Sequence, residues 1–265
     1  MTASSLPTTR PGRPPLSIQL WSTRGDTPLA EQLHDLAEMG YRDVQPFHDQ
    51  YDDVEGMAAL LAKNGMTARS GHFTMALLER ETDRVVAAAR RLGMDLVVAP
   101  WIDPEERPDD VSGWIALHER LLSLNARMQA EGLAFAWHNH DFEFVPLPDG
   151  SLPIEHILGS EIAFAADIAW IVRAGVDPVP WLRRYAGRVP AVHVKDVAPH
   201  GSNLDEMGFA DIGEGTMDWP ALWSVLDDLD VPLRIAEHDQ PSDWRRFARS
   251  GARAIAALDR AISPT

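Results

Sequence analysis

In two places along the sequence, an apolar run ends in a pair of polar side chains. His138 and His140 are separated by one residue, and so are His193 and Lys195. Because successive side chains of a β-strand point to opposite faces, each pair is expected to lie on one face of its strand. An imidazole can ligate a metal ion, and its ordinary pKa of about 6.5 also suits proton transfer near neutral pH. Both stretches therefore indicate a pocket for metal binding or acid–base chemistry.

Two carboxylates occupy similar positions. Asp167 follows the apolar run 162–166, and Glu237 ends another strand-like run. An unpaired carboxylate is costly to bury, so each is expected to meet a cation. Together with His193 and one more ligand from the segment 138–143, they would make a divalent-metal site suited to Mn, Mg, Co or Zn.

Each of these side chains also has an ordinary structural explanation. The histidine pair could be hydrogen-bonded in the core or lie on the surface. Asp167 could cap a helix or form a salt bridge, and Lys195 could pair with a neighbouring carboxylate. The sequence leaves these alternatives open.

Composition narrows the ligand types and the partners. The chain has 265 residues, a formal net charge of −16 and no cysteine. Disulfides and thiolate-bound zinc or iron–sulfur clusters are therefore excluded, and side-chain metal ligands must be His, Asp or Glu. The acidic balance disfavours binding to a nucleic-acid backbone, which needs a basic face. We expect no nucleic-acid partner.

The beginning of the chain differs from the rest. It is rich in Ser, Thr, Pro and Arg and has no apolar run, which predicts a flexible tail over residues 1–15 and no secretory signal. No stretch of the sequence approaches the roughly 20 apolar residues of a membrane span. We therefore expect a cytoplasmic protein with no membrane partner.

Short β-branched runs alternate with longer helical segments along the rest of the chain. Strands are predicted at residues 16–21, 43–47, 67–72, 96–100, 133–139, 162–167, 191–195 and 233–237. Helices are predicted at residues 29–39, 54–63, 83–92, 111–130, 153–158, 178–185, 219–229 and 243–262. Eight strand–helix units in about 250 residues are typical of an α/β fold, the (β/α)8 TIM barrel. No composition break divides residues 16–265, so they are predicted to form a single domain.

In a TIM barrel, functional side chains gather at the carboxyl ends of the strands. The predicted strand ends carry His72 and Gln45 as well as the groups named above. We expect Gln45 and the rings of Trp21, Trp101 and Trp170 to contact substrate, because indole rings can stack on the C–H faces of a sugar. Core packing is the alternative for these rings.

Taken in order, the motifs make the chain similar to the sugar phosphate isomerase/epimerase superfamily, whose barrels resemble xylose isomerase and endonuclease IV. The resemblance extends over the chain after the tail. It rests on Leu36-Ala37-Glu38-Met39-Gly40-Tyr41, Gly71-His72, His138-Asn139-His140-Asp141-Phe142-Glu143-Phe144, Asp167-Ile168-Ala169-Trp170, Ala174-Gly175-Val176-Asp177-Pro178, Val192-His193-Val194-Lys195-Asp196, Gly213-Glu214-Gly215, Asp218-Trp219 and Glu237-His238-Asp239.

The resemblance implies one metal ligand from each of strands five to eight, in the order Glu, Asp, His, Glu. Asp167, His193 and Glu237 match this pattern, but strand five reads His-Asn-His where many members read Glu-Asn-His. Strand register favours His138 as the fourth ligand. Glu143 is the rival ligand, if the chain bends back toward the metal.

The resemblance also implies a reaction. Members act on polyols, ketoses or keto-sugars that bind a divalent ion, which stabilises the enediolate formed on deprotonation beside the carbonyl. We expect an isomerase or epimerase. Loss of a β-oxygen would instead make a dehydratase or lyase, similar to inosose dehydratase or to enzymes that eliminate from 3-keto-glycosides. The expected acid–base groups are His140, Glu143 and His72, with Lys195 near the developing oxyanion.

Position 45 departs from the family pattern. Many members have a glutamate there, whereas this chain has Gln45, which argues against an epimerase mechanism with two glutamates. A non-catalytic sugar-binding or accessory barrel is a second class of function, and a repair endonuclease is a third. The ligand set argues against the second class, and the net charge of −16 argues against the third. The expected partner is a small neutral sugar or keto-polyol, and apolar helix faces leave room for a homo-oligomer.

Overall fold

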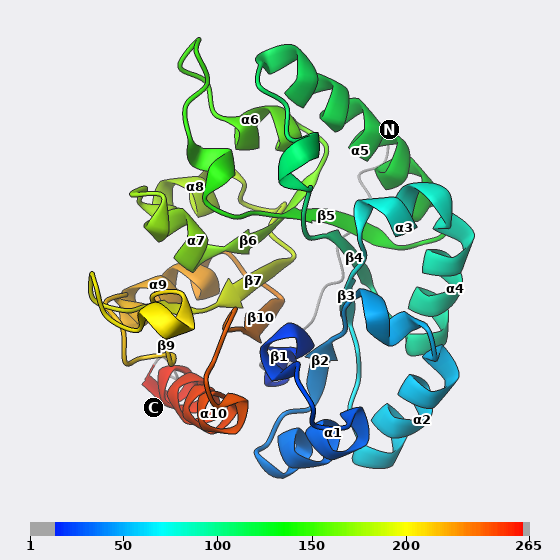
Figure 1. Ribbon diagram of the computed structural model, residues 1–265, viewed down its shortest axis with the longest axis vertical. Coiled ribbons are helices and arrows are strands. Elements are labelled where there is room, and N and C mark those ends of the chain that lie inside the picture. Colours follow the sequence, from blue (N-terminus) through cyan, green and yellow to red (C-terminus); the bar gives the residue numbers. More distant parts are fainter. Residues whose placement is uncertain (1–13, 262–265) are drawn as a thin grey trace.

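Eight parallel strands form the centre of the fold, and helices lie around them (Figure 1). The structure, a computed structural model, describes residues 14–261, so residues 1–13 of the predicted tail lie outside the described residues. The barrel strands are β1 (Ser17–Gln19), β2 (Asp43–Gln45), β3 (Ser70–His72), β4 (Leu96–Ala99), β5 (Ala134–His138), β6 (Ala163–Asp167), β7 (Ala191–Val194) and β10 (Leu233–Ala236).

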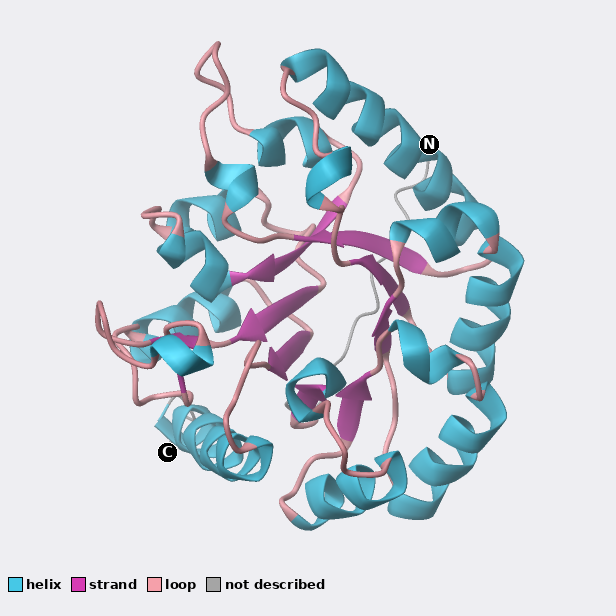
Figure 2. Cartoon of the chain, in the orientation of Figure 1, coloured by secondary structure: helices cyan, strands magenta, loops and turns pink. Residues whose placement is uncertain are grey.

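The eight strands pair in the order β2-β1-β10-β7-β6-β5-β4-β3. The two ends of this order, β2 and β3, approach each other through a parallel bridge between Asp43 and Thr67. The result is a nearly closed barrel within a ring of helices, as Figure 2 shows. The predicted TIM barrel and its single domain are confirmed.

The helices fill the connections between strands. They are α1 (Leu29–Glu38), α2 (Val54–Asn64), α3 (Met75–Arg80), α4 (Thr82–Leu92), α5 (Val111–Ala130), α6 (Pro153–Leu158), α7 (Ile168–Arg173), α8 (Pro178–Arg184), α9 (Trp219–Asp228) and α10 (Trp244–Ala261). Helices α2 and α4 end on Gly65 and Gly93, whose φ angles of 62° and 73° suit glycine best. Helices α3 and α7 are not among the predicted elements, nor is the antiparallel pair β8 (Asp196–Val197) and β9 (Phe209–Ala210).

Several strands are shorter than predicted. Strand β2 ends at Gln45 because Pro46 has no N–H to continue the ladder, and Pro100 follows the end of β4 in the same way. Strand β3 begins at Ser70 rather than at Thr67, which only bridges to β2. The eight predicted barrel strands are all present, and several of them are shorter than predicted.

Alternation along the strands separates two environments. One set of buried apolar residues forms its own cluster, made of Leu96, Val98, Ala136, Ala163, Ala165, Ala191, Leu233 and Ile235. The other set packs between the strands and the helices. Residues two positions beyond Ala136, Ala165, Ala191 and Ile235 share the face of the first cluster. This alternation places His138, Asp167, His193 and Glu237 in one polar layer above an apolar barrel interior.

The junction between β2 and β3 depends on side chains. The Asp43 Oδ1 atom accepts hydrogen bonds from Thr67 Oγ1 at 2.7 Å and from the Arg69 N–H at 3.0 Å. Further along, Gln45 Nε2 donates to Ser70 Oγ at 2.8 Å. Side-chain hydrogen bonds therefore supplement the backbone pairing where the barrel closes.

The glycines at 213 and 215 surround a carboxylate. Asp196 Oδ2 accepts a hydrogen bond from the Gly213 N–H at 2.9 Å, and its Oδ1 accepts from the N–H groups of Val197 and Met217 at 2.9 and 3.2 Å. A Cβ at position 215 would lie 2.1 Å from Asp196 Oδ1, so only glycine allows this approach. These backbone donors are already occupied by a carboxylate of the chain itself.

Within residues 14–261, none of the helices combines the length and the apolar composition that crossing a membrane requires.

Candidate metal centre and active site

Four side chains from neighbouring strands bring their ligand atoms together. His138 ends β5, Asp167 ends β6, His193 lies in β7 and Glu237 follows β10 directly. One potential ligand atom from each lies within 4.8 Å of all the others, and all four residues are buried. Strand register contributes to this geometry, since Asp167 and His193 are paired directly across β6 and β7.

The loop after β5 holds Asp167 in place. Asn139 Oδ1 accepts a hydrogen bond from the Asp167 N–H at 2.8 Å, and Asn139 Nδ2 donates to the Asp167 carbonyl at 3.2 Å. Asp167 is also the N-cap of α7, because its Oδ1 accepts from the Trp170 N–H at 2.9 Å. The cap uses Oδ1 and leaves Oδ2 to the polar layer, so the structural and metal-binding roles of Asp167 are compatible.

Lys195 is buried among carboxylates. Its Nζ lies 2.8 Å from Asp167 Oδ2, 3.1 Å from Glu237 Oε2 and 2.6 Å from Asp239 Oδ2. Burial alone would lower the pKa of Lys195, but the three carboxylates together raise it above its usual value. Lys195 is therefore an ammonium ion. It pairs with neighbouring carboxylates, which was one of the alternatives that the sequence left undecided.

The remaining negative charge of the cluster favours a cation. Three carboxylates face one ammonium, and burial raises the pKa of Asp167 to about 6 and raises that of Asp239. Burial would also raise the pKa of Glu237, but Lys195 and His193 outweigh it and hold that pKa well below its usual value. Three ionised carboxylates and the Lys195 ammonium leave two negative charges, which a divalent ion would balance, so the donor set fits such an ion in both chemistry and charge.

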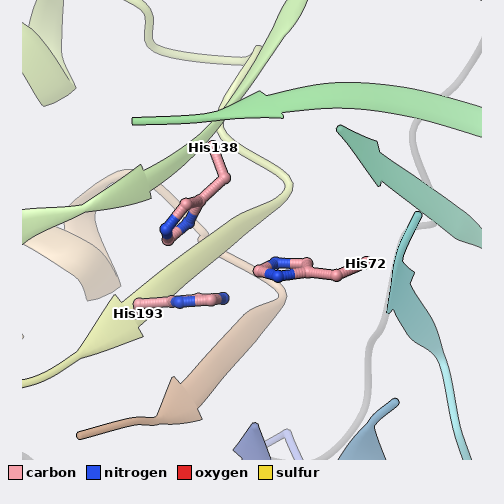
Figure 3. A group of neighbouring side chains, drawn as sticks. All are labelled: His72, His138 and His193. Atoms are coloured by element: carbon pink, nitrogen blue, oxygen red, sulfur yellow. The ribbon is translucent and has the colours of Figure 1, made fainter. Parts of the chain in front are cut away.

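Three histidines converge at this site, and two of them, His138 and His193, belong to the ligand group (Figure 3). His72 in β3 lies with its ring centroid 5.2 Å from that of His193 and 5.1 Å from that of His138. Among the described residues, His72 Nε2 and His138 Nδ1 are buried without a hydrogen-bond partner. Burial holds the pKa of both rings well below the usual value, so both are neutral and can offer a lone pair.

His140 lies between two tryptophans. Its ring centroid is 4.5 Å from Trp101, in an edge-to-face arrangement, and 5.2 Å from Trp170. Burial lowers the pKa of His140 to about 3, and its buried Nδ1 has no hydrogen-bond partner among the described residues. The ring is a neutral proton acceptor, and its centroid lies 5.2 Å from that of His138.

Glu143 points away from the ligand group. It lies in the 3₁₀ turn Phe142–Phe144, where its Oε1 accepts from Trp137 Nε1 at 3.0 Å and its Oε2 accepts from the His140 N–H at 2.8 Å. Trp137 belongs to the outward face of β5, opposite to His138. The structure therefore brings His138, and not Glu143, to the other three candidate ligands.

The buried carboxyl of Glu143 makes the stability of the fold depend on pH. Burial raises its pKa from 4.5 to about 8, although its hydrogen bonds and the charge of Arg107 act in the other direction. Between these values the native state keeps a proton that the unfolded chain has released. The contribution of Glu143 to the free energy of unfolding is therefore expected to fall by up to about 1.4 kcal/mol per pH unit between these two pKa values and to level off above them. Urea denaturation across this range measures the slope.

One variant tests this assignment to Glu143, and a second serves as its control. Glu143→Gln removes the ionisable group, so its unfolding free energy should lack this slope. Glu119→Gln, on the exposed face of α5, should keep it. An unchanged slope in Glu143→Gln would show that another group causes the pH dependence.

The remaining predicted site residues separate into two groups. Trp101 and Trp170 flank His140, whereas Trp21 packs edge-on against Phe47 with ring centroids 5.2 Å apart. Gln45 is fully buried and bonds to His193 Nε2 at 2.8 Å. The side chain of Gln45 is thus committed to the ligand layer, which is not the substrate contact expected from its position at a strand end.

Two participants were not among the predicted site residues. Asp239 pairs with Lys195, and Asn139 clamps the backbone of Asp167. The sequence contains a signal for the first, because Asp239 is two residues beyond Glu237 and so has the same parity. It contains none for the second, because a strand-end asparagine between two histidines is compatible with many contacts.

Sequence comparison assigns the family. A model of the xylose isomerase-like TIM barrel family matches residues 33–258. The chain belongs to this family. The resemblance inferred from the motifs is confirmed.

Relatives of this xylose isomerase-like chain have several activities. It is 25% identical over 235 residues to the rhizopine catabolism protein MocC of Rhizobium meliloti, across 77% of this chain and 71% of MocC. A sugar phosphate isomerase/epimerase from Parabacteroides distasonis ATCC 8503 has the same fold, with a TM-score of 0.77 and 17% identity over 97% of this chain and 98% of that one. The IOLI protein with a bound zinc atom has a TM-score of 0.72 and 13% identity over 95% and 100% of the two chains. Other structures with this fold include an L-ribulose 3-epimerase and a probable dehydratase.

Proposed function

We propose that this chain is a divalent-metal-dependent enzyme that isomerises or epimerises a keto-sugar or polyol at the carbon next to a carbonyl. The observation that supports it best is the convergence of His138, Asp167, His193 and Glu237, with their ligand atoms within 4.8 Å of one another. Family membership agrees with an enzyme of this kind. Mn, Mg, Co and Zn are all compatible with two imidazoles and two carboxylates.

We assign separate catalytic roles to the ligand group and to the side chains around it. His138, Asp167, His193 and Glu237 would hold the divalent ion, which would supply Lewis-acid polarisation of the substrate carbonyl. His140 is the group we assign to proton removal, because it is neutral, buried and unpartnered at Nδ1 among the described residues. Trp101 and Trp170 confine the substrate beside it, while Lys195 provides positive charge near the developing oxyanion. The proton that His140 takes up is the one returned to the substrate, and His72 offers a second unpartnered imidazole nitrogen that can accept a proton.

A neutral substrate fits the chain better than a phosphorylated one. Phosphate sites in TIM barrels usually employ backbone N–H groups that follow the last strands. Here the carboxylate of Asp196 accepts hydrogen bonds from such groups at Gly213 and Met217. We therefore propose a neutral sugar or keto-polyol.

A dehydratase or lyase is the alternative, and Gln45 favours it. An amide replaces the carboxyl group that a two-glutamate epimerase would have at the end of β2. Elimination from a keto-sugar, as in an inosose dehydratase-like enzyme or one acting on 3-keto-glycosides, needs one base at the acidic C–H and an acid for the departing oxygen. His140 takes the first role, and the proton that it removes from the C–H is the one that the departing oxygen then receives.

Metal analysis followed by labelling tests the proposal. The purified protein should contain or take up about one divalent ion per chain, and removal of that ion should stop turnover. Incubation with keto-sugars in deuterated water should then place solvent deuterium in an isomeric product. An enone or a released aglycone would establish the lyase instead. A protein that takes up no metal and turns over none of these substrates would be a non-catalytic or accessory barrel.

Other properties remain part of the proposal. We place the enzyme in the cytoplasm, with residues 16–265 as its catalytic domain. Its partner is a small sugar, and neither nucleic acid nor membrane is expected to bind. A homo-oligomer is compatible with the helix faces.

A further inference from the structure

His193 has a polar partner at each ring nitrogen. Its Nδ1 is in hydrogen-bonding contact with Glu237 Oε2, and its Nε2 lies 2.8 Å from Gln45 Oε1. A neutral imidazole has one N–H and one lone pair, so the position of the proton decides which nitrogen can ligate a metal. The neighbours of Gln45 determine that position.

The orientation of these groups can be traced from a backbone donor. The N–H of Trp21 can only donate, and it lies 3.0 Å from Gln19 Oε1. The amide of Gln19 is therefore turned so that its Nε2 donates to Gln45 Oε1 at 2.7 Å. A reversed Gln45 amide would place two NH₂ groups against each other. Gln45 must therefore present its oxygen to His193 and its Nε2 to Ser70 Oγ, which is 2.8 Å away.

Gln45 Oε1 can only accept hydrogen bonds, so Nε2 of His193 must carry the ring proton. The Nδ1 lone pair then faces the carboxylate of Glu237. Two lone-pair atoms repel each other unless a proton or a metal ion lies between them. We propose that Gln45 is a positioning residue that holds His193 in the tautomer with Nδ1 directed to the metal, an inference that rests on the proposed metal-dependent function.

This role explains why an amide suits the end of β2. Gln19, Gln45, Ser70 and His193 are all fully buried, so each bond in the chain is shielded from water. Partners of this kind orient a metal-ligating histidine and raise the basicity of the ligating nitrogen. Gln45 thereby contributes to metal affinity without touching the substrate, and the other two histidines in Figure 3 keep their free nitrogens.

Nuclear magnetic resonance of the metal-free wild-type protein tests the tautomer directly. The ¹⁵N shifts and ring couplings of His193 should show a proton on Nε2. A proton on Nδ1 with a bare Nε2 would overturn the inference. This measurement needs no bound metal and no variant, so its outcome is independent of whether the proposed function is correct.

Metal affinity provides the second readout, measured by calorimetric titration of Mn²⁺ and Zn²⁺ into the metal-free protein. Gln45→Leu should weaken binding by roughly 10- to 100-fold, and Gln45→Glu, which keeps an acceptor oxygen, should restore it. Gln19→Leu should also weaken binding, although Gln19 does not contact His193, because Gln45 is then free to reverse its amide. Gln129→Leu, at an exposed position of α5, is the matched control and should bind as the wild type does.

The pattern across these variants separates positioning from general packing. Equal affinity in Gln45→Leu and wild type would overturn the inference, as would equal losses in Gln19→Leu and Gln129→Leu. If Gln45→Leu does not fold, Gln45→Glu and the other two variants still decide the question. Failure of the wild type to bind either ion would refute the proposed function, while the tautomer of His193 would still be measured.

Discussion

Replacement of Asp167 by Asn is expected to abolish tight binding of the divalent ion while the barrel stays folded. Asn keeps Oδ1, which caps α7 through the Trp170 N–H, but it replaces Oδ2 by an NH₂ group. That group cannot ligate a cation, and it also faces the ammonium of Lys195. The variant therefore loses a ligand and gains a repulsive contact within the site.

The expected losses are large. Metal affinity should fall more than about 100-fold, which exceeds the effect of removing an outer partner of a ligand. Turnover should fall by roughly 1000-fold or more, since Lewis-acid assistance contributes several kcal/mol. Calorimetric titration and a steady-state assay measure the two effects, and circular dichroism checks the fold.

Asp177→Asn is the matched control for Asp167→Asn. Asp177 is also a helix N-cap, because its Oδ1 accepts from the Val179 N–H at 2.9 Å, but it is exposed and starts α8. It should bind metal and turn over substrate as the wild type does. Wild-type metal affinity in Asp167→Asn would contradict the proposed ligand set.

Replacement of Lys195 by Met should destabilise the metal-free protein strongly. The ammonium contacts three carboxylates, and removal of one partner from a buried ion cluster typically costs about 3–5 kcal/mol. Without it, the pKa values of the carboxylates rise in the native state. The deficit in unfolding free energy should therefore be small in acid and grow as the pH rises through those raised values.

A divalent ion should reduce this deficit. It brings positive charge to the same carboxylates, so a saturating concentration narrows the gap between Lys195→Met and wild type. Guanidinium denaturation at several pH values, with chelator and with added ion, provides the comparison. The control is Lys63→Met, because Lys63 is exposed and is the only other lysine in the sequence. This substitution should change the unfolding free energy little under any of these conditions. A deficit independent of both pH and metal would indicate lost packing rather than uncompensated charge.

The sequence predicted the barrel and the site layer because both depend on short-range regularities. Strand parity alone is enough to place His138 and His193 on the inner face, and alternation of strands and helices is enough to predict parallel pairing. The strand boundaries differ from the predicted ones, because proline and local turns end strands such as β2 earlier than the apolar pattern suggests.

The sequence could not predict where side chains point once a strand has ended, or which distant residues they contact. Glu143 lies close to His138 along the chain, yet it turns back to Trp137 on the opposite face of β5. Gln45 bonds to a histidine 148 positions away in the chain. Contacts of this kind depend on how the barrel closes, and no periodicity in one segment encodes them.

The junction of β2 with β3 has a consequence for how the molecule fluctuates. Local opening is easiest where few backbone hydrogen bonds must be broken. The β2 and β3 segments are joined by the backbone pairs Val44–Thr67, Thr67–Arg42 and His72–Pro46 and by the side chains of Asp43 and Gln45. A fluctuation that parts the two strands also strains the contact between Gln45 and His193. We therefore expect a divalent ion held by His193 to slow the opening of this junction.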